Sequence, residues 1–298
     1  MLMFSTASLE KLFNKWVRRN RMLNTSYVPE YSLEEDAFVG TNRYFFESKL
    51  KVLAIMAKEE QWNFKSERYR DPEKNYPILS NYLYFTYDRL KVEGKISVLD
   101  DESAMCFNTG LQTRDYERDI YAYFVRNIKY PDETPKKWYL SKFCKSNDVE
   151  LTSFSSLPEI AEYWNEPTDL IFDKRLDIRF NDKHIVEDNI ERFKEVGLDY
   201  PPEILISLLE QATEKASKRV RRNYKIAIPQ FYTDKEKNQS KIQLLLPLCF
   251  DSTNKAALAL VISKENNAYI AKTVLPLDWA YMNSRRIVTP DADWITSI

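Results

Sequence analysis

The sequence predicts an α+β protein. Its expected order is a helical N-terminal region, a helix followed by a β-hairpin as in a winged-helix unit, and a C-terminal antiparallel sheet packed with helices. Helix-like spacing of apolar residues recurs through the first part of the chain, and IQLLLPLCF, AALALVIS and YIAKTVL near the C-terminus are typical of three consecutive strands. Helices and strands that occur in separate runs indicate an α+β fold.

Composition limits the classes of function. The 298 residues are 44% hydrophobic and 30% charged with a net charge of -1, so any contact with nucleic acid depends on local patches. The longest apolar run is too short to span a bilayer, and the opening residues lack the apolar core of a signal peptide. Cys106, Cys144 and Cys249 are isolated, which predicts neither disulfides nor a metal site, and no cofactor motif is found. A cytoplasmic location is expected.

The first predicted region, residues 1–76, is helical. Residues 8–22 form a basic amphipathic pattern that can bind a protein partner or a membrane surface, or pack on its own domain. A second helix is expected over residues 43–62. The two prolines in DPEKNYP then break the pattern, which places a boundary before an α+β domain of residues 77–298.

A helix over residues 79–91 and its stop at Gly94 lead into the hairpin strands KISVL and AMCFN. The second strand runs into Asn108, Thr109 and Gly110. These three residues predict a polar turn at a strand end, where backbone N–H groups can hold a phosphate; an ordinary turn uses the same residues.

The middle of the chain is expected to contain a helix over residues 119–127 and strands over residues 138–143 and 170–180. His184, the single histidine, follows with Asp188 four residues later on the same face of a short helix. This pair is a candidate for general acid or base chemistry, or for a hydrogen-bonded structural role.

A long helix is expected over residues 203–223 and ends in the cation-rich stretch KASKRVRRNYK. Helical geometry points Lys218 and Arg221 away from the apolar stripe and places Arg219 on its margin. A guanidinium that is partly withdrawn from water needs a carboxylate in the protein or an anion from outside. Both alternatives are open at this point.

Several separated blocks resemble one family. PILSNYLYFTYDRLKVEGKI, FNTGL, RVRRNYKIAIPQFY, IQLLLPL and LDWAYMNSRRIVTPDADW are similar to a bacterial domain of unknown function, family 3825, over about residues 45–298. Trp279 and Ser284 depart from the usual Met and Ala. Family members occur beside RNA-associated modules, so the resemblance implies work on RNA or nucleotides. The matching positions are Asn81, Arg89, His184 and Asn189, together with every ligand-binding residue given below except Tyr232.

Three functions are considered. The first is an intracellular RNA- or nucleotide-binding domain in which arginines and the Asn-Thr-Gly turn hold phosphate and a tyrosine stacks on a base. The second is an enzyme acting on nucleotides or phosphate esters with His184 as acid or base, although no Walker loop, HExxH pair or carboxylate cluster is found. The third is a protein scaffold that binds through residues 8–22. The predicted ligand-binding residues are Asn108, Thr109, Gly110, Arg219, Arg222, Asn223, Tyr224, Gln230, Tyr232, Gln243, Asn283 and Arg285.

Overall fold

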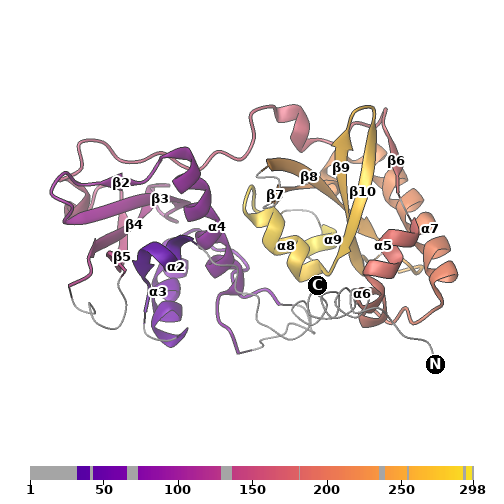
Figure 1. Cartoon of the computed structure of the whole chain (residues 1–298), viewed down its shortest axis with the longest axis horizontal. Helices are drawn as coiled ribbons and strands as arrows, with labels where there is room; N and C mark the ends of the chain where they lie inside the picture. The colour runs from indigo at the N-terminus through magenta and orange to yellow at the C-terminus, as the bar shows by residue number, and fades with distance from the viewer. Residues whose placement is uncertain are drawn as a thin grey trace, which may run out of the picture.

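The computed structural model describes residues 32–40, 43–65, 73–128, 136–180, 182–234, 239–253, 255–290 and 293–296. The helix predicted over residues 8–22 lies outside these ranges. The chain forms two lobes, each with a five-stranded sheet, and the connection between them crosses one side of the molecule (Figure 1). The predicted α+β class is confirmed.

The N-terminal lobe combines three helices with the first sheet. The helices are α2 (Ser32–Asp36), α3 (Arg43–Met56) and α4 (Pro77–Glu93). The strands are β1 (Ala37–Phe38), β2 (Ser97–Val98), β3 (Ala104–Gln112), β4 (Asp119–Arg126) and β5 (Trp138–Lys145), in the order β1-β5-β4-β3-β2. All neighbours are antiparallel except β1 and β5. As predicted, α4 ends at Gly94, which adopts a left-handed conformation, and a hairpin of β2 and β3 follows.

The C-terminal lobe holds the second sheet. Its strands are β6 (Asp177–Arg179), β7 (Ile228–Asp234), β8 (Gln239–Leu248), β9 (Leu258–Glu265) and β10 (Ala268–Leu275), in the order β6-β10-β9-β8-β7. The meander β8-β9-β10 is antiparallel as predicted, and β6 adds in parallel to β10. Its helices are α5 (Asp182–Asp188), α6 (Ile190–Glu195), α7 (Pro202–Arg222), α8 (Leu277–Arg285) and α9 (Asp293–Thr296). Short 3-10 turns are η1 (Val149–Leu151), η2 (Pro167–Leu170) and η3 (Tyr224–Ile226).

The two faces of this second sheet contact different partners because side chains alternate along a strand. Leu244 and Leu246 of β8 face the apolar stripe of α7, whose members are all buried: Leu205, Leu209, Ala212, Ala216 and Val220. Leu245 points to the opposite face and shares a core with Tyr281 of α8 and Leu79 of α4. A single apolar cluster therefore continues from one lobe into the other.

Three predicted elements differ from the structure. The helix expected over residues 43–62 ends at Met56, and Ala57 forms a β-bridge with Thr113. Residues 119–127 form strand β4 instead of a helix, because they pair with β3 on one side and β5 on the other. Of the strand expected over residues 170–180, only Asp177–Arg179 forms a strand. Leu170, the first residue of that range, is the last residue of η2. Among the described residues, no helix has the length and apolar character needed to cross a membrane.

Candidate anion-binding site

The predicted Asn-Thr-Gly turn is an irregularity within β3, since the strand continues to Gln112 and its pairing with β4 shifts after Asn108. The Asn108 side chain is buried; its Nδ2 lies 3.2 Å from Asp119 Oδ2 and 3.4 Å from the Pro158 carbonyl, and its Oδ1 accepts the Gly110 N–H at 2.9 Å. The buried Thr109 hydroxyl donates to the Ile120 carbonyl at 2.6 Å. Both side chains are therefore engaged by the protein itself.

Arg285 is tied to this bulge through Tyr82 of α4. Tyr82 donates its hydroxyl to the Thr109 carbonyl at 2.9 Å, and the Arg285 guanidinium lies 4.5 Å from the centre of the Tyr82 ring. The guanidinium also forms a two-pronged ion pair with Glu60, with Nη2 at 2.7 Å from Oε1 and Nε bonded to Oε2, and lies over the Trp62 ring. Glu60, Trp62, Tyr82 and Arg285 are called the lobe junction below. At this junction the charge of Arg285 is neutralised internally.

Gln230 and Gln243 are directly opposite each other on β7 and β8 and are buried. Gln230 Nε2 donates to Gln243 Oε1 at 2.9 Å, and no hydrogen-bond partner of Gln230 Oε1 is found among the described residues. Asn283 is half-buried on α8, which packs against β7. The two glutamines thus mainly complete hydrogen bonding inside the sheet.

The C-terminal part of α7 forms a concave surface with the end of β8. A cavity of about 240 Å³ is lined by Lys215, Ala216, Lys218, Arg219, Pro247 and Cys249, and these six residues define the α7 pocket. Ala216 and Cys249 are buried, Arg219 is half-buried, and the two lysines are exposed. The buried residues therefore form the floor of the pocket, and the cations form its wall and rim.

The charge on Arg219 lacks an acidic partner in the described ranges: no carboxylate oxygen lies within 4.0 Å of its guanidinium. Its Nη1 donates instead to Cys249 Sγ at 3.1 Å. Burial raises the pKa of Cys249, and this effect outweighs the opposite influence of Arg219, so the thiol stays neutral at pH 7. Lys218 differs from Arg219, because its ammonium lies 2.6 Å from the exposed Glu214 carboxylate.

The residues after Arg219 continue the basic surface without lining the pocket. Arg222 donates to the Lys218 carbonyl at 2.8 Å, and Asn223 ends the helix and accepts the Lys225 N–H. Tyr224 is 60% exposed immediately beyond the helix end, and Tyr232 is 42% exposed on the edge strand β7. Both rings can be reached from solvent.

His184 lies outside the α7 pocket on α5. Its Nδ1 is 3.1 Å from Asp188 Oδ2, which places the predicted pair together, and its side chain is 67% exposed. His184 does not line the α7 pocket, and an imidazole this exposed lacks the surroundings that orient a general base toward a substrate.

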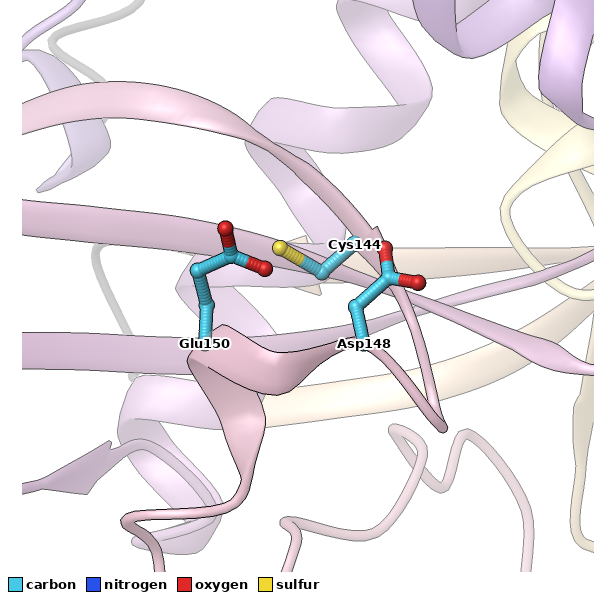
Figure 2. Close-up of side chains that lie close together, drawn as sticks. All are labelled: Cys144, Asp148 and Glu150. Atoms are coloured by element: carbon cyan, nitrogen blue, oxygen red, sulfur yellow. The ribbon is translucent and has the colours of Figure 1, made fainter.

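A cluster of possible metal ligands is formed by Cys144, Asp148 and Glu150, whose ligand atoms lie within 4.8 Å of one another. Figure 2 shows the Cys144 sulfur facing the Glu150 carboxylate. Glu150, however, pairs with Lys142, and Asp148 Oδ2 accepts the Lys145 N–H at 2.9 Å. Burial raises the pKa of the Cys144 thiol to about 11, whereas a metal needs the thiolate. The bonds of Glu150 and Asp148 to Lys142 and Lys145 stabilise the connection between β5 and the turn that follows it, and they engage the two carboxylates that a metal would need.

The structure therefore divides the predicted site residues. Figure 1 shows β3 in one lobe and α7 at the far end of the other, so Asn108 and Arg219 do not share a pocket. Of the six residues that line the α7 pocket, only Arg219 was predicted to bind a ligand; Lys215, Ala216, Lys218, Pro247 and Cys249 were not. Lys215 could have been identified from its position four residues before Arg219 on the same helix. Pro247 and Cys249 reach the site only through folding.

Comparison with known proteins identifies the family. Residues 53–294 match the model described as "Domain of unknown function (DUF3825)", and the chain belongs to this family. No curated protein and no solved structure matches. The α7 pocket lies within the matched segment.

Proposed function

We propose that this member of the DUF3825 family binds a phosphate-bearing ligand, RNA or a nucleotide, in the α7 pocket. One observation carries the proposal: the half-buried guanidinium of Arg219 has a thiol, and no carboxylate of the described residues, as its partner at a concave surface. Partial removal from water weakens the hydration of a charge, and an anionic ligand restores favourable electrostatics.

The geometry of α7 also explains why side chains must supply the positive charge. The C-terminus of a helix carries partial negative charge, which disfavours anions, but this field falls off within the last turn. Lys215 lies about two turns before Arg222, the last helical residue, and Arg219 lies in the last turn. The full charges of the guanidinium and ammonium groups can hold phosphate oxygens there through charge-assisted hydrogen bonds.

Recognition of a nucleobase is assigned in this proposal to the exposed ring of Tyr224. Arg221 and Arg222 are exposed next to it, and a basic surface with an accessible aromatic ring is typical of single-stranded nucleic-acid binding. Three cysteines without a disulfide fit an intracellular location, which belongs to the proposal. Asn108 and Thr109 have no part in it, because their side chains hold the β3 bulge.

The test compares Arg219→Ala with its neighbour Arg221→Ala, which is exposed on the same helix. Binding of a fluorescent single-stranded RNA is measured at two salt concentrations. Arg219→Ala should weaken binding by about 1 to 3 kcal/mol, because a partly desolvated ionic contact is lost. Arg221→Ala should weaken binding modestly and reduce the salt slope by about one at most. Negligible effects of both substitutions would refute the proposal.

A further inference from the structure

We infer that the α7 pocket selects a terminal phosphate monoester, carried by a mononucleotide or by an RNA end, over a phosphodiester inside a chain. This inference rests on the proposed function and makes its ligand specific. It follows from three properties of the pocket, which are its charge, its size and the distribution of its polar groups.

The cations of the pocket can engage more negative charge than one phosphodiester carries. Arg219 and Lys215 have no carboxylate within 4.0 Å in the described part of the chain, although the Asp251 carboxylate interacts electrostatically with Lys215. Lys218 pairs with Glu214. A phosphodiester brings a single negative charge. A phosphate monoester brings about -1.5 to -2 at pH 7 and three oxygens that accept strong hydrogen bonds. Arg219, together with the partly compensated Lys215, therefore suits a monoester better than a phosphodiester.

The size of the pocket points the same way. Its volume of about 240 Å³ is below the range of about 300 to 1,000 Å³ that is usual for sites that enclose a drug-sized ligand. It has room for a phosphate group and part of the attached sugar. The base must then lie outside, where Tyr224 is exposed.

The distribution of polar groups favours a chain end. Ala216, Pro247 and Cys249 contribute methyl, ring and thiol groups to the lining, while the three cations all come from the α7 side. An internal phosphodiester has only two unesterified oxygens to turn toward the cations, and both of its sugars must fit at the opening of the pocket. A terminal phosphate can turn three unesterified oxygens toward the cations, and its single sugar lies at the opening.

The experiment uses the full chain and oligonucleotides of one sequence that differ only at their ends: 5′-phosphate, 3′-phosphate or hydroxyl at both ends. A nucleoside 5′-monophosphate and inorganic phosphate serve as competitors, which separates a mononucleotide from an RNA end as the source. We expect a phosphorylated end to bind at least about tenfold more tightly than the hydroxyl form, a difference equal to about 1.4 kcal/mol. The preference should vanish in Arg219→Ala and persist in Arg221→Ala.

Each failure has a distinct signature. If all three oligonucleotides bind equally and Arg219→Ala weakens all of them, the phosphate-binding function stands and the end preference is wrong. If none binds, both are wrong.

A second readout avoids any dependence on how the variant folds: alkylation of Cys249 in the unsubstituted protein should be slowed by the phosphorylated oligonucleotide and not by the hydroxyl form. Equal labelling of Cys249 in both cases would contradict the inference.

Discussion

Arg285 at the lobe junction and Arg219 in the α7 pocket were both expected to bind a ligand, and their surroundings differ. Arg285 is 7% exposed, bonds to both oxygens of Glu60 and lies over two aromatic rings. Arg219 is half-buried and donates to a thiol. Burial alone would lower the pKa of Arg285, but the Glu60 carboxylate with Tyr82 and Tyr281 raises it overall.

The comparison teaches that withdrawal from water does not by itself mark a ligand-binding arginine. A buried guanidinium that already pairs with both oxygens of a carboxylate has few hydrogen-bond donors free for an anion. Removing it leaves the buried carboxylate without a partner. A half-buried guanidinium without such a partner can accept an anion and contributes little to folding. The two residues should therefore respond oppositely in assays of stability and binding.

The largest effect is expected from Arg285→Ala. Removing one partner of a buried pair strands the other charge, so the free energy of unfolding should fall by about 3 to 5 kcal/mol. Urea denaturation measures the change. Glu60→Ala should cost a similar amount, and the double variant should cost less than the sum of the two because neither charge is then stranded. An additive double variant would show that the pair is not coupled, and the contrast with Arg219 would be lost.

Gly110→Ala tests the link between the β3 bulge and the lobe junction. Gly110 has φ +72°, and an added Cβ would lie 2.6 Å from Tyr82 Oη. Gly94 is a matched control, since its φ is +67° and no atom lies within 4 Å of its added Cβ. Gly94→Ala should cost about 1 to 2 kcal/mol of stability for the left-handed backbone alone. Gly110→Ala should cost more.

The excess cost at Gly110 should disappear in a Tyr82→Phe background. The substitution removes the hydroxyl oxygen, and the next Tyr82 atom lies 3.9 Å from the added Cβ. Tyr82→Phe itself should cost about 1 kcal/mol, because the Thr109 carbonyl loses a donor. If Gly110→Ala costs the same in both backgrounds, the tyrosine is not the group that requires glycine.

Much of the fold was predictable because its periodicity is strong. The apolar stripe of α7 and the three strands of the meander follow from spacing alone, and each expected stripe residue of α7 is buried. Strand β4 was missed because DIYAYFVR is apolar on both faces, and such a run does not distinguish a helix from a central strand. The Asn-Thr-Gly segment was interpreted as a turn, whereas a glycine within a strand also indicates a bulge.

The site was predictable only in part. Helical geometry placed Arg219 correctly at the margin of the buried stripe, between water and the core. It could not show which residue would be opposite, and Cys249 is 30 positions away in the sequence. Likewise, nothing in the spacing of Glu60 and Arg285 indicated that they form an ion pair, because their contact arises from the packing of α8 against the N-terminal lobe.

The buried thiols of the N-terminal lobe should make the stability of the protein depend on pH. Burial is the main cause that raises the pKa of Cys106 to about 12 and that of Cys144 to about 11, from an ordinary value of 9.0. Below pH 9 both thiols are protonated in the folded and unfolded chain, so they do not affect stability. Above pH 9 the unfolded chain releases protons that the folded chain retains, and stability falls by about 1.4 kcal/mol per pH unit for each thiol.

Cys106→Ala should therefore make the loss of stability between pH 9 and pH 11 shallower by up to about 1.4 kcal/mol per pH unit. Urea denaturation of both proteins across this range measures the slope. Between pH 7 and pH 8 the difference in free energy of unfolding between the two proteins should stay constant, because Cys106 is protonated in both the folded and the unfolded chain. An unchanged alkaline slope would mean that Cys106 ionises as readily in the folded chain as in the unfolded one.

Small effects on stability are expected from Arg219→Ala and Arg221→Ala without ligand. No carboxylate within the described ranges is left unpaired, and only a weak bond to a thiol and some packing of the side-chain stem are lost, so the cost should stay below about 1 kcal/mol. Arg221→Ala, on the exposed side, should remain within about 0.5 kcal/mol of the unsubstituted protein.

Adding ligand should reverse the ranking of the two regions. A nucleoside 5′-monophosphate at about 100 times its Kd should stabilise the unsubstituted protein by about 2.7 kcal/mol, and Arg219→Ala should lose most of this gain. Arg285→Ala should keep the gain if enough folded protein remains to measure it, since Arg285 does not line the α7 pocket. A loss of about 3 kcal/mol in ligand-free Arg219→Ala would contradict the comparison, because only an internal ionic partner makes an arginine so costly to remove.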